Sequence, residues 1–298
     1  MRGKGIKKSS DVIAFNAITY PPIIVFTLLC VLPFYLIVIG SFTSENAILT
    51  KGFALYIRDF SLESYMLALK NPLSVVSAYR NTFFVTIVGT FCCVLLTTMT
   101  GYVLSRPEFP WRNKLTFYFF FTMLFSGGLV PWYIMCIRYF GFKNNMHSLI
   151  LPGMFSTWYM MIAKNFLKNV PIDIVESAKL DGANDFMIYY RIFIPVSKPL
   201  IATIALFAGL SYWNDWYNCM LFIQESDKIT LQFFLQQLLN NTRKMLEVAA
   251  QSGIIIPKLP EQTLKMVMTI IVTGPILLLY PFLQKYFIKG LTIGAVKG

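Results

Sequence analysis

Long apolar runs without charge constrain the fold of this chain more than any other feature of its sequence. A helix needs about 20 residues to cross roughly 30 Å of hydrocarbon. Four charge-free runs have that length: Pro21–Gly40, Phe83–Leu104, Leu115–Ile137 and Met266–Gln284. Two weaker candidates are Ser148–Ala163, which is short, and Leu200–Ile223, which Asp215 interrupts. We therefore expect six membrane-spanning helices.

The composition also indicates a membrane protein. The chain is 56% hydrophobic and 13% charged, whereas soluble domains carry about 25% charged residues. Lipid offers the backbone no hydrogen-bond partner, so a span must be a helix or part of a closed barrel, and these runs lack the alternation of barrel strands. The expected fold is all-α and polytopic. Basic flanks that face anionic membrane lipid explain much of the net charge of +12, and no nucleic acid is expected as a partner.

The first residues, MRGKGIKK followed by an apolar run, resemble the start of a signal peptide. The apolar run is longer than the usual 7–15 or so residues of a signal peptide, and no A-x-A site follows. We therefore expect a retained first span. With the amino terminus in the cytoplasm, lysine and arginine are more frequent in the cytoplasmic segments than in the external ones, which is the usual orientation. Both termini and the segment 171–199 then face the cytoplasm.

The segment 171–199 interrupts the apolar sequence with acids, a glycine and two prolines. Pro171 suits the first turn of a helix, and Gly182 suits the left-handed end of one. The pair Asn184-Asp185 can cap a second short helix, which should end near Pro195 because proline disfavours helix at the residue before it. The pattern predicts a helix–glycine–helix elbow; an ordinary interfacial loop is the alternative.

This segment resembles the EAA-type cytoplasmic loop of bacterial ABC-importer permeases, whose pattern is E-A-A-x-x-D-G-A, an apolar stretch and P-x-x-x-P. The matching positions, with serine in place of the central alanine, are Glu176, Ser177, Ala178, Asp181, Gly182, Ala183, Phe186, Pro195 and Pro199. In that family the loop forms a coupling helix that sits in a cleft of a cytoplasmic ATPase. The resemblance implies the type I ABC importer permease fold and an ATPase-coupling role for these residues.

The carboxy terminus, GLTIGAVKG, resembles the tail of maltose-type carbohydrate-importer permeases. The matching residues are Gly290, Leu291, Thr292, Gly294, Val296, Lys297 and Gly298. In that family the tail reaches into the ATPase dimer interface, whereas taken alone it would indicate a glycine-rich disordered end. Asn81-Thr82 and Trp213-Asn214-Asp215 also stand where the family carries N-S/T and W-N-E/D patterns.

The resemblance implies three kinds of protein partner for this chain. They are a second homologous permease subunit, two cytoplasmic ATPase subunits that bind ATP and Mg, and an external solute-binding protein. The sequence itself contains no G-x-x-x-x-G-K-[ST] loop and no hydrolase or metalloprotease motif. We expect no catalytic residue, no metal site and no cofactor in this chain.

Polar groups inside a span are expensive and are candidates for function. Asp215 is the one acid within a predicted span, and Trp213, Asn214 and Trp216 adjoin it. These residues, with Trp158 and Tyr159, are the predicted solute path; an interfacial aromatic belt or ordinary packing is the alternative. In the third predicted span, the adjacent glycines of SGGLVPWY and Pro131 favour either close helix packing or a hinge.

The predicted organisation has four parts. Residues 1–20 form a cytoplasmic segment, 21–80 the first span and an external loop, 81–289 the core permease domain, and 290–298 the cytoplasmic tail. The predicted function is ATP-driven import of a carbohydrate, an oligosaccharide or glycan fragment, across a bacterial cytoplasmic membrane. The rival interpretations are a similar importer for a peptide or polyamine, and a secondary transporter, for which the sequence lacks charged spans and inverted repeats.

Overall fold

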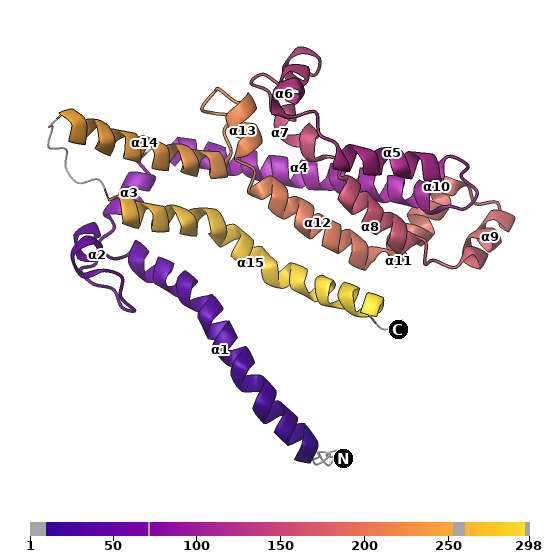
Figure 1. Cartoon of the computed structure of the whole chain (residues 1–298), viewed down its shortest axis with the longest axis horizontal. Coiled ribbons are helices and arrows are strands. Elements are labelled where there is room, and N and C mark those ends of the chain that lie inside the picture. The colour runs from indigo at the N-terminus through magenta and orange to yellow at the C-terminus, as the bar shows by residue number, and fades with distance from the viewer. Residues whose placement is uncertain (1–9, 71, 253–259, 296–298) are drawn as a thin grey trace. The chain divides into compact units, whose positions relative to one another are not determined.

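The structure, a computed structural model, describes residues 10–70, 72–252 and 260–295, and these are mostly helical (Figure 1). The amino-terminal half contains α1 (Ser10–Ser41), α2 (Glu45–Lys51), α3 (Glu63–Ala68), α4 (Pro72–Ser105), α5 (Arg112–Leu124), α6 (Leu129–Arg138) and α7 (His147–Ile150). A 3-10 turn, η1 (Leu151–Gly153), leads to α8 (Thr157–Leu167), α9 (Ile172–Leu180), α10 (Asp185–Ile188), the π-helical turn η2 (Tyr189–Phe193) and α11 (Ile194–Val196). The remaining helices are α12 (Lys198–Trp213), α13 (Tyr217–Phe222), α14 (Leu231–Ser252) and α15 (Glu261–Ala295).

The chain divides into two compact units. The first comprises Met1–Lys70 and Asn241–Gly274, and the second comprises Asn71–Asn240 and Pro275–Gly298. Both α14 and α15 contribute residues to each unit, because their ranges cross these boundaries.

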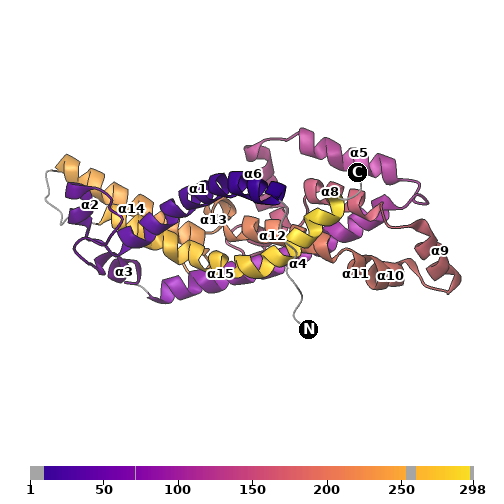
Figure 2. The same cartoon turned by 90° about the horizontal axis from the view of Figure 1, so that it is seen from below.

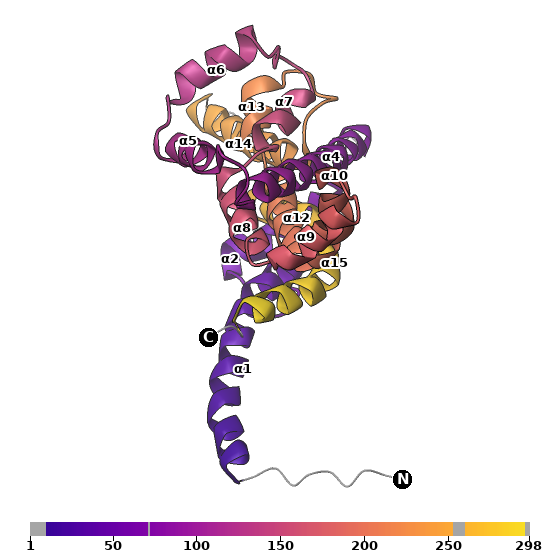
Figure 3. The ribbon, with the colours of Figure 1, turned by 90° about the vertical axis from the view of Figure 1, so that its right-hand side faces the viewer.

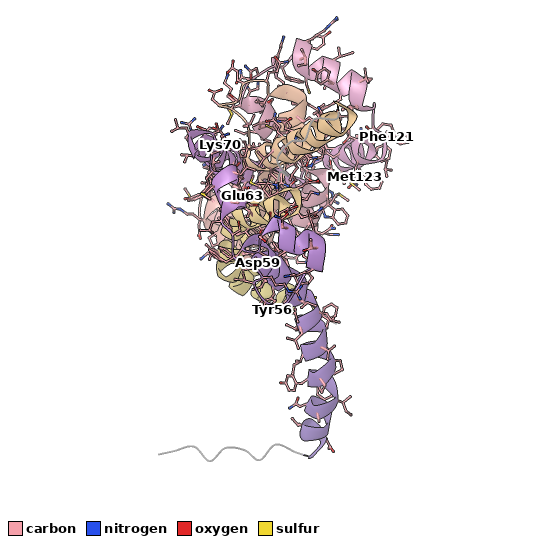
Figure 4. The ribbon with its side chains drawn as sticks, turned by 90° about the vertical axis from the view of Figure 1, so that its left-hand side faces the viewer. Tyr56, Asp59, Glu63, Lys70, Phe121 and Met123 are labelled. Carbon is pink, nitrogen blue, oxygen red and sulfur yellow. The ribbon has the colours of Figure 1, made fainter. Side chains whose placement is uncertain are left out.

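The first unit is joined by polar bonds between segments far apart in the sequence. The Glu45 carboxylate accepts hydrogen bonds from the backbone N–H groups of Gln262 (3.0 Å) and Thr263 (2.9 Å) and from the Thr263 hydroxyl (2.8 Å). It therefore caps the amino-terminal end of α15, whose first N–H groups have no partner within the helix. The segment before α3, which includes Asp59 in Figure 4, returns to the end of α1 through an antiparallel bridge between Thr43 and Phe60.

In the second unit α4 packs against α8 and α12, and small residues permit the close approach (Figures 1 and 2). A Cβ atom on Gly101 would lie 2.7 Å from Cβ of Ala163 in α8. The Tyr212 side chain of α12 occupies the space beside Gly89 of α4 and Gly153 of η1, where an added Cβ would lie 2.5 Å and 2.7 Å from the ring. Without a hydrophobic driving force between helices in lipid, such close contacts supply much of the attraction.

Three of the described helices are long and apolar enough to cross a membrane. The number of candidate spans rises to as many as five if each of two bent helix pairs is counted as one span. The three unbroken candidates are Phe15–Ser41, Leu73–Ser105 and Glu261–Leu278. The third predicted span, Leu115–Ile137, is wrong as a single helix, because α5 and α6 meet at 114°. Gly128 at this break has φ +88°, a left-handed conformation that glycine adopts without strain.

The glycines at this break do not mediate close packing. No atom lies within 4 Å of a Cβ built on Gly127, and the nearest to Gly128 is Cδ of Pro131 at 4.0 Å. Of the two interpretations of SGGLVPWY, the structure supports a bend and not a close helix contact.

The two weaker predicted spans are also interrupted. Ser148–Ala163 consists of α7, η1 and the first part of α8, with residues 154–156 outside any helix. Leu200–Ile223 is split where α12 ends at Trp213 and α13 begins at Tyr217. The expectation that the second short helix ends near Pro195 is confirmed: helical backbone continues through the π turn, where the Ile194 N–H bonds the carbonyl of Tyr189 five residues back, and ends at Val196.

Many apolar side chains of α1 and α5 are exposed. None of the residues of α5 is buried, and Phe121 and Met123, labelled in Figure 4, are about half exposed. Apolar surface of this extent suits lipid or another membrane subunit, as expected of a membrane protein.

The close approach of α4 and α8 generates a stability prediction. Gly101→Ala should lower the melting temperature of the purified protein, because overpacking of a tight contact costs about 1–3 kcal/mol. Gly274→Ala is the matched control, since Gly274 also lies in a long apolar helix and no atom lies within 4 Å of its added Cβ. Equal melting temperatures for the two variants would contradict this account of the contact.

Candidate functional site

A cavity of about 380 Å³ lies in the second unit between the start of α8 and the break that separates α12 from α13. Its lining residues are Pro152, Gly153, Phe155, Ser156, Tyr159, Ala208, Ser211, Tyr212, Asp215 and Asn218. Hydroxyl, amide and carboxylate groups therefore alternate with aromatic and small apolar ones. Binding sites for small molecules in proteins commonly combine apolar walls with a few polar groups.

The cavity exists because two neighbouring helical segments are both interrupted beside it. Residues 154–156 separate η1 from α8, and Asn214–Trp216 separate α12 from α13. Non-helical backbone at membrane depth is tolerated where it is covered by protein or lines a water-filled space. Discontinuous helices of this kind often form the substrate sites of transporters.

Asp215 stabilises the second of these breaks. Its Oδ1 accepts a hydrogen bond from the Asn218 backbone N–H at 3.0 Å, and its Oδ2 accepts one from the Asn218 side-chain amide at 2.6 Å. The first bond caps α13, and the second orients the carboxylate at the cavity wall. The Thr230 hydroxyl also donates to the Asp215 carbonyl at 3.3 Å, so the backbone of this residue is held from the other side.

Asn81 and Thr82 hold residues 227–231 in place by hydrogen bonds, and Thr230 of this segment bonds Asp215. The Asn81 amide donates to the carbonyls of Asp227 (2.7 Å) and Ile229 (3.1 Å). The Thr82 hydroxyl accepts from the Leu231 N–H at 2.8 Å. Both side chains are buried in α4. Two motifs distant in sequence, Asn81-Thr82 and Trp213-Asn214-Asp215, thus belong to one hydrogen-bonded network through residues 227–231.

A turn at Asn144 holds the adjoining residues 224–228 in place. Asn144, with φ +54°, accepts hydrogen bonds at Oδ1 from the N–H groups of Gln224 (3.2 Å) and Glu225 (3.1 Å). The Lys228 ammonium donates to the Asn144 carbonyl at 3.1 Å and lies 2.7 Å from the Glu225 carboxylate. Hydrogen bonds from Lys228 and Asn144 lower the pKa of Glu225.

The predicted path residues fall in different places. Asp215 and Tyr159 line the cavity. Trp213 is buried with its ring edge-on to Phe83 at 5.1 Å, and Trp216 packs against the buried cluster around Cys219. Asn214 and Trp158 are exposed, and Asn214 donates back to the Leu210 carbonyl at 2.9 Å. These four residues do not line this cavity, and their path role stays a prediction.

Sequence reasoning missed four polar lining residues: Ser156, Ser211, Tyr212 and Asn218. The spacing of Asp215 and Asn218 is the usual spacing of a helix cap and the N–H that it bonds, which was the available signal. Ser156 caps α8 in the same way, although its bond to the Tyr159 N–H is long at 3.5 Å. Ser211 and Tyr212 stand out only because the tertiary structure places them here.

The second candidate site is the segment 171–199, whose helix α9 lies at one end of the second unit, away from α13 (Figures 1 and 2). Gly182 has φ +83°, as its sequence position predicts. The Gly182 N–H bonds the Lys179 carbonyl at 3.0 Å, and the Ala183 N–H bonds the Ala178 carbonyl at 2.9 Å. This pair of bonds is the Schellman motif that ends a helix. Asn184 caps α10 through a 2.8 Å bond from the Met187 N–H, again as predicted.

Buried aromatic and aliphatic residues anchor this segment to α4, α8 and α12. Figure 3 shows α9 and α10 together with these helices, viewed from that end. Val175 and Ile188 are fully buried. Tyr189 and Phe193, which the π turn η2 presents, pack on Tyr102 of α4 with ring centroids 5.5 Å and 4.7 Å away. The Tyr189 hydroxyl also lies 2.8 Å from that of Thr98 in α4.

The opposite face of the segment is open. Glu176, Ser177, Asp181, Gly182, Phe186 and Pro195 are exposed, and Ala178, Ala183 and Pro199 are half-buried. Leu180 is 89% exposed and Phe186 is 69% exposed, which leaves two large apolar side chains beside the acids. Exposed apolar groups next to polar ones are typical of a surface that another protein covers.

The tail is described in part. The backbone of α15 continues to Ala295, so Gly290, Leu291, Thr292 and Gly294 are helical. Val296, Lys297 and Gly298 lie outside the described residues. The predicted contact of the tail with an ATPase stays a prediction.

Comparison with known proteins places these features in a family, although no protein-family model matches the chain. It is 37% identical to the polygalacturonan/rhamnogalacturonan transport system permease protein YtcP of Bacillus subtilis, over 95% of this chain and 98% of the relative. It is 36% identical to the protein LplC of Bacillus subtilis, over 90% of each.

A solved structure supports the same fold. The crystal structure of a bacterial ABC transporter involved in the import of the acidic polysaccharide alginate contains a similar chain, with a TM-score of 0.78 and 24% identity. The similarity covers 95% of this chain and 99% of the other. With two relatives above 30% identity along nearly its whole length, this chain belongs to the carbohydrate ABC transporter permeases.

Proposed function

We propose that this chain is one of two permease subunits of a heteromeric ABC importer that moves an oligosaccharide into a bacterial cell. The observation that carries this proposal is the cavity between two interrupted helices, with walls of tyrosine, serine, asparagine and aspartate. Sugar rings have apolar faces that stack on aromatic side chains and hydroxyls that bond polar ones. Relatives named for polygalacturonan, rhamnogalacturonan and arabinooligosaccharide transport support an oligosaccharide or glycan fragment as the solute.

The energy would come from elsewhere in the complex. Two cytoplasmic ATPase subunits bind ATP and Mg, and this chain supplies no catalytic residue. The exposed surface of α9 and α10, with Leu180 and Phe186 beside Asp181, suits a groove on such a subunit. When the ATPases close, they move this surface, and the buried contacts of Tyr189 and Phe193 with Tyr102 carry the motion to α4.

The arrangement in the membrane follows from this assignment. We propose six spans, in which the bent pairs and the interrupted segments each cross once, with both termini in the cytoplasm. An external solute-binding protein then delivers the oligosaccharide on the side of the turn at Asn144. The second permease subunit and lipid cover the exposed apolar faces of α1 and α5.

One rival solute fits a specific observation. The Asp215 carboxylate at the cavity would also suit the cationic groups of a polyamine. The names of the relatives do not favour a polyamine, and spermidine is therefore a comparison solute in the ATP hydrolysis experiment that tests the proposed function.

The first prediction from the proposed function concerns the solute. The complete complex, reconstituted in proteoliposomes with its solute-binding protein, should hydrolyse ATP faster when a pectic or arabinan oligosaccharide is present. Spermidine and a tripeptide serve as comparison solutes at equal concentration. Stimulation by either of these, with none by any oligosaccharide, would contradict the proposed function.

The second prediction concerns Gly182. Gly182→Leu should reduce uptake for each ATP hydrolysed, because a side chain in the left-handed conformation costs about 1–2 kcal/mol and shifts the end of α9. Gly141→Leu is the matched control: Gly141 also has positive φ (+61°) and open space around its Cβ, but lies in the turn after α6. The control should lose similar stability and keep its coupling ratio. An unchanged ratio in both variants would exclude a coupling role for Gly182.

The third prediction concerns the tail. Deletion of Gly290–Gly298 should lower ATPase activity or assembly of the complex, while the solute-binding protein keeps its affinity for the oligosaccharide. Deletion of three residues at the amino terminus is a suitable control for a terminal truncation. If the shortened complex assembles and retains the ATPase rate of the intact one, the tail has no role at the ATPase interface.

A further inference from the structure

We propose that the cavity beside Asp215 receives an uncharged sugar unit and disfavours a sugar carboxylate, with Asp215 as the specificity-determining residue. This inference rests on the proposed function, since it specifies which part of an oligosaccharide the cavity takes. It concerns the charge of the solute, which neither the fold nor the similarity to carbohydrate permeases fixes.

The first argument for this selectivity is the charge of the cavity wall. Among the described residues that line the cavity, Asp215 is the one with a charged side chain, and neither lysine nor arginine is present. Proteins bind a carboxylate with arginine, lysine or several N–H donors, which neutralise its charge. Here a uronate carboxylate would meet a second carboxylate in a partly enclosed space. Like charges at such distances repel more strongly in a protein cavity than in water.

The second argument is the hydrogen-bonding capacity of Asp215. An ionised carboxylate has about four acceptor positions and no donor. Asn218 fills two of them, one at each oxygen. The remaining positions require donors, and sugar hydroxyls are donors whereas a uronate carboxylate is not. The bonds from Asn218, together with the Thr230 bond to the Asp215 carbonyl, also keep the carboxylate from turning away from the cavity.

The third argument is the aromatic lining of the cavity. The Tyr212 hydroxyl already donates to the Ile150 carbonyl at 2.7 Å, and the ring is fixed beside Gly89 and Gly153. Tyr212 therefore offers the cavity an immobile wall more than a free donor. A neutral pyranose ring can lie against such a wall with its hydroxyls toward Asp215 and Ser211. In an oligosaccharide that contains both neutral and acidic sugars, the neutral unit would enter this cavity.

A pair of solutes that differ only in charge tests the inference. Digalactose and digalacturonate have the same linkage and ring, and differ by a hydroxymethyl or a carboxylate group on each sugar. Each is supplied at increasing concentration to the complete complex in proteoliposomes, with ATP hydrolysis and thermal stabilisation as readouts. We expect the wild type to respond to digalactose at a concentration roughly tenfold or more below that required for digalacturonate, as expected from one charge-assisted contact.

The Asp215→Asn variant should change the two responses in opposite directions. It replaces one acceptor oxygen with an NH2 donor and removes the negative charge that strengthens bonds from hydroxyls, so the half-saturating concentration of digalactose should rise by roughly tenfold, the effect of one lost polar contact. The variant also removes the repulsion between the two carboxylates, so the half-saturating concentration of digalacturonate should fall. Asp227→Asn makes the same chemical change on an exposed residue outside the cavity lining and should alter neither value. Ser211→Ala removes a hydroxyl without a charge and should not discriminate between the two solutes.

The outcomes separate this inference from the proposed function. A wild-type complex that responds equally to both sugars, or an Asp215→Asn variant that weakens both alike at unchanged melting temperature, would overturn the charge selectivity and leave the importer assignment intact. A complex that responds to spermidine and to neither sugar would overturn the proposed function and, with it, the neutral-sugar site.

Discussion

Backbone groups within a membrane require internal hydrogen-bond partners, and the second unit of this chain depends on the side chains that supply them where its helices are interrupted. Asp215 accepts from the Asn218 N–H at the break before α13. Asn81 and Thr82, buried in α4, satisfy two carbonyls and one N–H of residues 227–231. Without such partners each unsatisfied group would cost several kcal/mol in lipid, so an interruption is possible only where a partner is provided.

Helix α4 connects the two candidate sites. Its amino-terminal part contains Asn81 and Thr82, which fix the segment that bonds Asp215. Its other end contains Thr98 and Tyr102, which contact the π turn of the segment 171–199 through Tyr189 and Phe193. A helix of this length spans about 50 Å. One rigid element therefore contacts both the cavity network and the surface proposed to meet the ATPase.

The local structure of the segment 171–199 was predictable because it depends on residues close in sequence. A glycine after a short helix and an asparagine before the next one have backbone preferences that hold in most contexts, and Gly182 and Asn184 adopt them. The end of the second helix near Pro195 was predictable for the same reason, and helical backbone stops at Val196. The π turn before it was not predictable, because it places Tyr189 and Phe193 against α4 and so depends on a tertiary contact.

The sequence by itself determined that this is a membrane protein, that it is helical, and that the segment 171–199 and the carboxy-terminal tail resemble those of a known family, because apolar length and fixed local spacing are properties of the chain. It also indicated Asp215 and Tyr159 as candidates for a polar path. Only the tertiary structure decided that α5 and α6 bend at Gly128, that Trp213 is buried, and that Ser156, Ser211, Tyr212 and Asn218 meet around one cavity. These outcomes depend on which breaks lie side by side, and helix packing, not local propensity, sets that arrangement.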